Sequence, residues 1–268
     1  MKRIFTLLTV VMTMLMPSLS WGGSAESSEA KFAPAKVAAY ASELQKDLAA
    51  RGANVAIVAR VGRDRGTLPD GIQYTHVAYW VYSEMTRKDG STFKGYRVYN
   101  LYQTPDDDTI SRLVQDSPAQ FFAGAHSLDA GVIIPDRRLQ KKLLKTIASP
   151  TYADLHNDSY SVLANPKSTR FQNCTEHTLD VLMASLYDTN DQSQIKANIA
   201  AHFDPQPIKI GGLKRLLAPA ASGALTTADH KGKIATATFG SIARFMATHE
   251  ISDQIYRFTA TGPTPFGV

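Results

Sequence analysis

Residues 72–103 run IQYTHVAYWVYSEMTRKDGSTFKGYRVYNLYQ and contain two predicted β-strands joined by a tight turn. Over residues 72–82 the side chains alternate between two faces, which is the period-two pattern of a strand. The turn signal Lys88-Asp89-Gly90-Ser91 leads into the second strand, residues 96–103. A β-branched run over residues 53–61 predicts a buried strand before them. Three successive strands with short connections predict an antiparallel meander.

Helices are predicted on both sides of this meander. Apolar residues recur at helical spacing after Pro34, and Gly52 stands where a helix-ending glycine is expected. The same spacing predicts helices over residues 139–147, from Cys174 onwards, over 195–202 and over 238–249. Residues 106–114 are interpreted as helical, and residues 132–134 and 160–163 as short strands. An antiparallel sheet with helices before and after it predicts an α+β fold.

The composition is that of an ordinary globular protein. The 268 residues are 44% hydrophobic and 20% charged, which excludes a disordered, collagen-like or multi-span membrane protein. Lys and Arg outnumber Asp and Glu by 29 to 24, but the basic residues are scattered along the chain. Without a dense basic run, nucleic acid is not expected to be a partner.

The first 22 residues have the features of a secretory signal peptide. Lys2 and Arg3 precede an apolar run over residues 4–15, and small residues follow. The run is short for a bilayer span, so stable membrane insertion is not expected after signal cleavage; a retained amino-terminal anchor is the alternative. We therefore expect a periplasmic or secreted protein with a flexible leader at 23–35, an α+β core at 36–204 and a C-terminal extension at 205–268 packed on the core.

Cys174 is the only cysteine of the chain, so no intramolecular disulfide can form. It stands at the predicted start of a helix, where unsatisfied backbone N–H groups and the helix dipole favour a thiolate. It is therefore a candidate nucleophile, although a lone cysteine is more often a small buried apolar residue. A redox role is a weak alternative because the chain has no resolving cysteine.

A cysteine nucleophile needs a histidine as base and acid, and a third polar group that orients the imidazole ring. Among the seven histidines, His76 lies within the strand at residues 72–82, between apolar and aromatic neighbours. An unpaired imidazole would be costly in such a place, so His76 needs a partner. That partner is either a catalytic group or a backbone carbonyl or tyrosine hydroxyl that makes His76 purely structural.

Several segments resemble known families. The sequence FQNCTEHTL at residues 171–179, placed after a histidine-bearing strand, resembles the Asn-Cys motif of circularly permuted papain-like enzymes. These enzymes include lecithin:retinol acyltransferase-like proteins and permuted relatives of bacterial cell-wall amidases and peptidases. The chain as a whole resembles the bacterial exported domain-of-unknown-function family 2145 at residues 71–77, 98–103, 172–177 and 237–239. The resemblance implies a permuted papain-like core over residues 36–204.

The resemblance also implies roles for individual residues. Cys174 matches the nucleophile and His76 the general base, and the orienting residue falls on a strand after the histidine strand. Asn100 is the candidate for that third position, because an amide can accept the ring N–H and fix the tautomer. Gln103 and Tyr102 compete with Asn100, since the register of residues 96–103 is not known from the sequence.

The surroundings of Cys174 complete the predicted site. Its backbone N–H, with Gln172 or Asn173 nearby, is the candidate oxyanion hole. His177 stands where the permuted enzymes often have a phenylalanine, and it is an alternative base. A Cys-x-x-His pair also raises the question of a metal, but the ligands of a structural zinc site are missing, so neither metal nor other cofactor is expected.

Two functions follow from these observations. The first is an exported cysteine hydrolase or acyltransferase that acts through a Cys-His pair on an amide bond. Cell-wall peptide is the expected substrate class, with another periplasmic amide or an ester, including a lipid ester, as alternatives. The second is a non-catalytic module on the same scaffold that binds a ligand or partner at the aromatic meander. The accessibility and ionisation of the Cys174 thiol distinguish the two functions.

Overall fold

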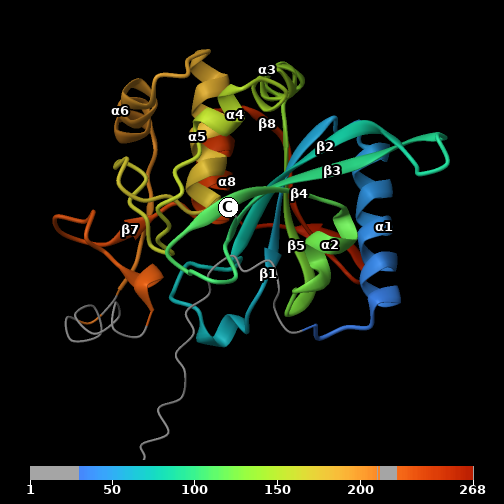
Figure 1. Cartoon of the computed structure of the whole chain (residues 1–268), viewed down its shortest axis with the longest axis horizontal. Helices are drawn as coiled ribbons and strands as arrows, with labels where there is room; N and C mark the ends of the chain where they lie inside the picture. Colours follow the sequence, from blue (N-terminus) through green and yellow to red (C-terminus); the bar gives the residue numbers. More distant parts are fainter. Residues whose placement is uncertain (1–29, 210, 212–221, 268) are drawn as a thin grey trace, which may run out of the picture.

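The computed structural model describes residues 30–209, 211 and 222–267. An antiparallel sheet of seven strands in the order β4-β3-β2-β1-β5-β8-β9 forms its centre (Figure 1). The strands are β1 (Val55–Val61), β2 (His76–Thr86), β3 (Thr92–Gln103), β4 (Ser111–Asp116), β5 (Ser127–Pro135), β8 (Ser252–Thr259) and β9 (Gly262–Pro265). Two short strands, β6 (Gln206–Pro207) and β7 (Ala235–Thr236), pair separately.

Helices cover both faces of this sheet. One face carries α1 (Pro34–Ala50) and α2 (Pro118–Ala123). The other carries α3 (Arg137–Ile147), α4 (Thr151–Asp154), α5 (Cys174–Tyr187), α6 (Gln192–His202) and α8 (Phe239–Thr248). Figure 1 shows α1 and α2 to one side of the sheet and α5, α6 and α8 to the other. Two 3-10 turns, η1 (Arg65–Thr67) and η2 (Gly223–Leu225), lie in the connections.

The alternation of side chains along the central strands divides the interior into two cores. All seven residues of β1 are buried, because helices lie against both faces. Ala56 and Val58 join the core under α1 and α2, whereas Ile57 and Ala59 join the core under α3, α5 and α8. The predicted α+β fold is therefore confirmed, with an antiparallel sheet at its centre.

Local signals in the sequence account for several elements. The apolar stripe predicted after Pro34 is the buried face of α1: Val37, Tyr40, Ala41, Leu44 and Leu48. Beyond its end, Gly52 has a φ of +68°, and the N–H of Ala53 bonds to the Leu48 carbonyl. The predicted hairpin is also confirmed, since β2 and β3 pair across a turn in which Gly90 has a φ of +83°.

Two predicted elements are wrong. Residues 106–114 do not begin a helix, because Asp107 accepts the Thr109 N–H within a turn and the chain then pairs with β3 as β4. The alternation of Leu113 and Val114 with polar neighbours fits a strand paired on one edge. Residues 160–163 form no strand; Tyr160 makes an isolated bridge to Gln172 instead.

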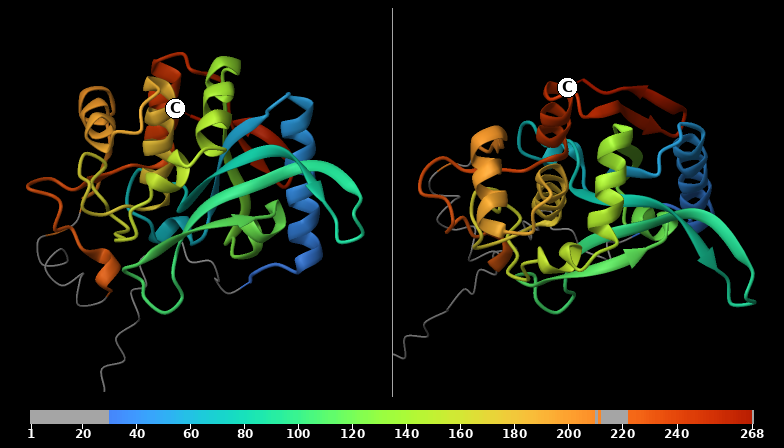
Figure 2. Two further views of the ribbon diagram at one scale, coloured as in Figure 1. Left: turned by 45° about the horizontal axis from the view of Figure 1, so that its top comes forward. Right: turned by 90° about the horizontal axis from the view of Figure 1, so that it is seen from above.

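The C-terminal residues contribute to the main sheet. β8 pairs with β5 along seven residue pairs, and α8 packs in the core beside α5. The Tyr40 hydroxyl of α1 bonds to the Phe258 carbonyl at 2.6 Å, which ties the two ends of the described chain together. Figure 2 shows β8 and β9 beside α1. Residues predicted as a C-terminal extension thus contain part of the central architecture, while the signal peptide predicted at 1–22 lies outside the described residues.

Candidate active site

The start of α5 positions Cys174. Asn173 caps the helix, because its Oδ1 accepts the backbone N–H groups of Thr175 and Glu176 at 3.0 and 2.9 Å. Its Nδ2 donates to the carbonyls of Ser161 and Val162 at 3.3 and 3.1 Å. Both ends of the Asn173 amide are therefore engaged in holding the helix start, so this side chain cannot also donate to an oxyanion.

The Cys174 side chain is 4% exposed and forms no disulfide. Its Sγ lies 3.8 Å from the Thr175 hydroxyl, which is its one hydrogen-bonding contact within the described part of the chain. The Cys174 backbone N–H donates to no acceptor among the described residues, as is typical of the first turn of a helix. This N–H is therefore available to a bound ligand.

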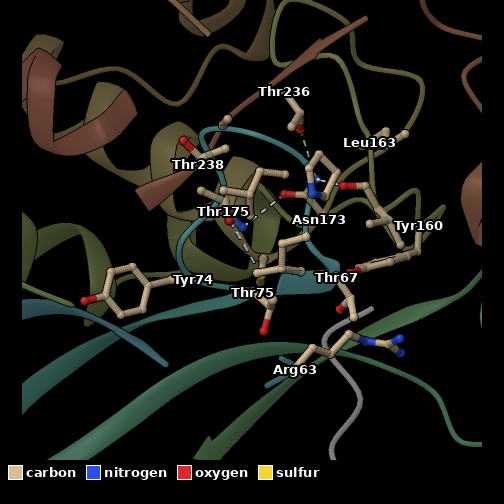
Figure 3. Close-up of a pocket in the computed structure, with 16 residues that line it drawn as sticks. Arg63, Thr67, Tyr74, Thr75, Tyr160, Leu163, Asn173, Thr175, Thr236 and Thr238 are labelled. Carbon is tan, nitrogen blue, oxygen red and sulfur yellow. Dashed lines mark hydrogen bonds between the residues drawn. The ribbon is translucent and has the colours of Figure 1, made fainter. Parts of the chain in front are cut away.

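Cys174 lines a pocket of about 280 Å³. The pocket lies between residues 62–75, the approach to α5 and the segment from β7 to α8. Figure 3 shows Arg63 and Thr67 on one side, across from Thr236 and Thr238. Its described lining is rich in hydroxyl groups: Thr67, Thr75, Thr175, Thr236, Thr238, Tyr74 and Tyr160.

His76 opens β2 and is fixed from several sides. Its Nε2 lies 2.9 Å from Asn100 Oδ1 on β3, and its ring stacks on Tyr102 with centroids 4.7 Å apart. Asn100 Nδ2 and the Tyr102 hydroxyl both donate to Asp116 Oδ2 on β4, at 3.0 and 2.9 Å. Three neighbouring strands thus orient one imidazole. The structure brings together His76 and Asn100, the predicted base and orienting residue.

The hydrogen bonds also define the His76 tautomer. A carboxylate only accepts, so Asp116 fixes the Asn100 amide with Nδ2 toward itself and Oδ1 toward His76. His76 Nε2 must then carry the proton, which leaves Nδ1 as an acceptor. Nδ1 is buried and has no hydrogen-bond partner among the residues that the structure describes. The ring therefore presents an unprotonated nitrogen that no other described group contacts through a hydrogen bond.

Arg60 dominates the electrostatics around this imidazole. It is the residue that faces His76 across β1 and β2, it is 2% exposed, and its guanidinium lies 5.9 Å from the Tyr102 ring centre. Burial, and then the positive charge of Arg60, lower the pKa of His76 well below its usual value. Arg60 also interacts electrostatically with Cys174. His76 is therefore neutral at physiological pH.

Cys174 and His76 reach the same end of the sheet from its two faces. Trp80 shares a face with His76 and belongs to the core under α1 and α2. Cys174 packs with Leu101 of β3, which points to the opposite face. Thr75, next to His76, lines the pocket together with Cys174. No hydrogen bond between the described side chains joins Cys174 Sγ to the His76 ring.

The remaining predicted residues lie outside the pocket lining that is described. Gln172 donates to the Leu155 carbonyl and to Asp180, so it anchors the segment before Cys174 instead of facing a ligand. His177 packs edge-on against Tyr152, and burial lowers its pKa to about 3. Gln103, a competitor of Asn100, donates to the Asp108 carbonyl.

Sequence reasoning missed a buried charge cluster on the other side of α5. Lys196 of α6 bonds to Glu176 and Asp180 of α5, both at 2.7 Å, and both carboxyl groups are at most 5% exposed. Burial raises the pKa of both carboxyl groups, against the opposing effect of the Lys196 ammonium. A basic residue in the second turn of a helix gives no local sign that it pairs with an earlier helix, so only the fold reveals this anchor.

Arg60 and Asp116 were also missed, and here a sequence signal existed. Arg60 is a charged residue inside the apolar run of residues 53–61, where burial demands a compensating partner.

Among the described residues, no group of three or more His, Cys, Asp or Glu side chains is placed to hold a metal ion. No helix in residues 30–209, 211 and 222–267 combines the length and apolar character needed to cross a bilayer.

The fold and site define an α+β protein with a single cysteine at a helix start beside a hydroxyl-rich pocket. The chain belongs to a family of uncharacterized proteins conserved in bacteria (DUF2145), whose model matches residues 47–246. All four segments on which the predicted kinship rests fall within that range. No curated protein and no solved structure shows a match to the chain. The resemblance to permuted papain-like enzymes is therefore not confirmed.

Proposed function

We propose that this protein is an exported cysteine hydrolase or acyltransferase that acts on amide bonds through Cys174 and His76. The observation that carries the proposal is the orientation of His76. Its Nε2 is held by Asn100 at 2.9 Å, and its buried Nδ1 has no hydrogen-bond partner in the described part of the chain. A Cys-His-Asn constellation needs an imidazole fixed on one nitrogen by the amide and free to exchange a proton at the other.

The proposed reaction proceeds through a thioester on Cys174. His76 Nδ1 takes the proton of the Cys174 thiol, and Sγ attacks the carbonyl carbon of the substrate amide. The backbone N–H of Cys174 donates to the resulting oxyanion. The amide C–N bond then breaks as His76 returns the proton to the leaving amine, and a thioester remains on Sγ. Water, or an acceptor amine in a transferase, attacks the thioester while His76 takes its proton and returns it to the thiol.

This mechanism requires that Nδ1 and Sγ meet during the reaction. In the substrate-free structure the two side chains approach the end of the sheet from opposite faces, so the strand ends must rearrange when a substrate binds. Arg60 acts on the two groups in opposite ways. It interacts electrostatically with Cys174, so its cation stabilises negative charge on Sγ. The same cation, after burial, lowers the pKa of His76, which keeps the imidazole neutral but makes it a weaker base.

The substrate and location belong to the same proposal. Residues 1–22 have the pattern of a secretory signal, so the chain acts in the periplasm or outside a bacterial cell, without stable membrane insertion after cleavage. A peptide or peptidoglycan amide is the bond that such an enzyme meets first, and a lipid ester is the alternative. Neither nucleic acid nor a cofactor has a part in the mechanism.

A second candidate is a non-catalytic module that binds a small ligand. The observation that favours it is the composition of the pocket, whose described lining contains no His, Asp or Glu. In this case Cys174 is a buried helix-start residue, and the threonine and tyrosine hydroxyls bind the ligand. His76 then serves the packing between β2, β3 and α2.

The rate of Cys174 alkylation by iodoacetamide tests the proposal directly. The rate is measured in the folded protein between pH 5 and 9, for the wild type and for His76→Ala, with His202→Ala as a control at the exposed end of α6. At pH 7 we expect His76→Ala to react at least about tenfold more slowly than the wild type, because general-base assistance is lost. His202→Ala should react like the wild type.

The competing outcome is also clear. Labelling that is slow until the protein unfolds, or that is indifferent to His76, contradicts the hydrolase and favours the binding module. Release of soluble fragments from purified peptidoglycan, followed by mass spectrometry, provides a second readout. That release should be absent with Cys174→Ala.

A further inference from the structure

The proposed reaction creates a negative oxygen beside Cys174. When Sγ attacks an amide carbonyl, an electron pair moves onto the carbonyl oxygen, which is two bonds away from Sγ. Oxyanion sites in acyl-transfer enzymes combine a backbone N–H with a further N–H or O–H donor. The Cys174 backbone N–H is the first donor, because it has no acceptor among the described residues. A second donor must lie within hydrogen-bonding reach of the same oxygen.

The two side-chain amides next to Cys174 are engaged in other bonds. Asn173 uses both ends of its amide to cap α5 and to hold the segment before the helix. Gln172 donates to Asp180 and accepts the N–H of Asn157, both at 2.9 Å. The second oxyanion donor must therefore come from another group of the pocket.

Thr175 carries a hydroxyl group that is not engaged in this way. It is the second residue of α5, it lines the pocket together with Cys174, and it is 8% exposed. Figure 3 shows it beside Asn173 at the pocket wall. The long contact of its Oγ1 with Cys174 Sγ, at 3.8 Å, is its one side-chain hydrogen-bonding contact in the described part of the chain. A buried hydroxyl without a strong acceptor gains from an acceptor that enters the pocket.

Other hydroxyl groups of the described lining are less suited to this task. Thr67 and Thr236 donate to backbone carbonyls at 2.7 and 2.9 Å. Thr75 accepts the N–H of Gly62 at 2.8 Å but donates to no described acceptor, so it is a rival donor. Thr175 is favoured over it because its hydroxyl contacts the nucleophilic sulfur. A donor that close to Sγ can reach an oxygen two bonds from Sγ at about 3 Å.

We propose that the Thr175 hydroxyl is the second oxyanion donor of this site. The inference rests on the proposed hydrolase function and adds one catalytic residue to it. As the C–S bond forms, His76 takes the thiol proton, and the carbonyl oxygen accepts from the Cys174 N–H and the Thr175 O–H. When the carbonyl re-forms and the C–N bond breaks, His76 gives its proton to the leaving amine. Thr175 keeps its own proton throughout.

Two reactions of the same thiol distinguish an oxyanion donor from a structural residue. Acylation by 4-nitrophenyl acetate passes through a negative tetrahedral oxygen, whereas alkylation by iodoacetamide displaces iodide at a saturated carbon. Release of 4-nitrophenolate measures the acylation rate, after the rate of Cys174→Ala has been subtracted, and mass spectrometry measures the alkylation rate. The ratio of the acylation rate to the alkylation rate is compared between the wild type, Thr175→Val, Thr175→Ala and Thr175→Ser.

Thr178→Val is the matched control. Thr178 also lies on α5 and is buried, but it is outside the described pocket lining, and its hydroxyl donates to the Cys174 carbonyl at 2.9 Å. The control therefore removes a buried hydroxyl from the same helix without removing a group from the pocket wall. Thr75→Val tests the rival donor.

We expect Thr175→Val and Thr175→Ala to lower this ratio by at least about tenfold, because loss of one oxyanion donor slows acyl transfer strongly. Thr175→Ser keeps the hydroxyl, so its ratio should stay within about threefold of the wild type, and Thr178→Val should change the ratio less than about twofold. The alkylation rate of each variant, measured on the same sample, shows whether Cys174 keeps its folded environment.

The outcomes separate this inference from the hydrolase proposal. If alkylation depends on His76 but the ratio is unchanged in Thr175→Val, or falls equally in Thr178→Val, the Thr175 inference is wrong and the hydrolase stands. A ratio that falls in Thr75→Val and not in Thr175→Val assigns the role to Thr75 and also overturns the inference. If Cys174 reacts with neither reagent until the protein unfolds, the hydrolase proposal fails, and the Thr175 inference fails with it.

Discussion

The two members of the proposed catalytic pair are held by different kinds of interaction. His76 lies between the Tyr102 ring and Phe121 and is oriented by a chain of neutral and charged hydrogen bonds from Asn100 to Asp116. Cys174 instead depends on what anchors its helix and the segment before it. These anchors are the Asn173 cap, the Gln172 amide and the buried charges of Glu176, Asp180 and Lys196.

The polar atoms around His76 and around Cys174 differ in how many hydrogen-bond partners they have. The His76 ring is bonded through Nε2, and among the described residues its Nδ1 has no hydrogen-bond partner. Around Cys174 the thiol and the backbone N–H face a pocket and stay available. On the strand side the structure fixes the imidazole in one orientation, and on the helix side it leaves a pocket beside the thiol. Three predictions test how far this division holds.

The largest effect is expected on the helix side. Lys196→Met removes the one ammonium that Glu176 and Asp180 share, and leaves two buried carboxyl groups without a cation. Breaking such a buried pair costs about 3–5 kcal/mol in the free energy of unfolding. Chemical denaturation at pH 7 measures this loss, and the loss should shrink at lower pH as the carboxyl groups take up protons.

A matched control separates burial from charge. Lys145→Met removes a lysine from an exposed pair with Asp188, in which both side chains are at least 75% exposed. Exposed pairs contribute little, so this variant should lose less than about 1 kcal/mol. Equal losses in the two lysine variants would show that the buried cluster does not anchor α5.

The second prediction concerns a buried imidazole on α5. Burial lowers the pKa of His177 to about 3, whereas an unfolded histidine has a pKa of about 6.5. Below pH 6.5 His177 therefore binds a proton in the unfolded chain but not in the folded chain. The free energy of unfolding decreases as the pH falls through this range. Between pH 7.5 and 5.5 this residue should cost about 1.4 kcal/mol of unfolding free energy.

The measurement compares denaturation of the wild type and His177→Leu at the two pH values. The difference between the proteins should change by that amount, with the wild type losing more at pH 5.5. Glu176 and Asp180, whose pKa values are raised, act with the opposite sign as the pH falls, but they are present in both proteins and cancel. A pH-independent difference would mean that His177 accepts a proton in the folded protein.

The smallest effect is expected on the strand side. Tyr102→Phe removes the hydroxyl that bonds to Asp116 but keeps the ring that stacks on His76. We expect a loss of about 1 kcal/mol in the free energy of unfolding, and a change of less than about twofold in Cys174 alkylation at pH 7. Tyr102→Leu also removes the ring that stacks on His76. It should lose more unfolding free energy than Tyr102→Phe and should slow Cys174 alkylation further. If Tyr102→Phe abolishes alkylation, the hydroxyl and not the ring orients His76.

Much of the candidate site follows from short segments of the sequence. The helix start at Cys174 depends on Asn173 and the next few N–H groups, and the alternation in β2 places His76 among aromatic residues. The choice among Asn100, Gln103 and Tyr102 depends on the pairing of β3 with its neighbours. The sequence pattern of a strand does not specify its pairing register, so the sequence leaves three candidates. The structure places Asn100 Oδ1 beside His76 Nε2.

The sequence by itself determined the α+β class, the hairpin of β2 and β3, the limits of α1 and the start of a helix at Cys174. Each of these depends on residues within a few positions of one another, through turns, caps and periodic burial. Only the tertiary structure decided that residues 111–116 are a strand, that β8 joins β5, and that Lys196 neutralises part of α5. Those features arise from hydrogen bonds and charges between segments far apart in the chain. A local sequence pattern does not identify such distant partners.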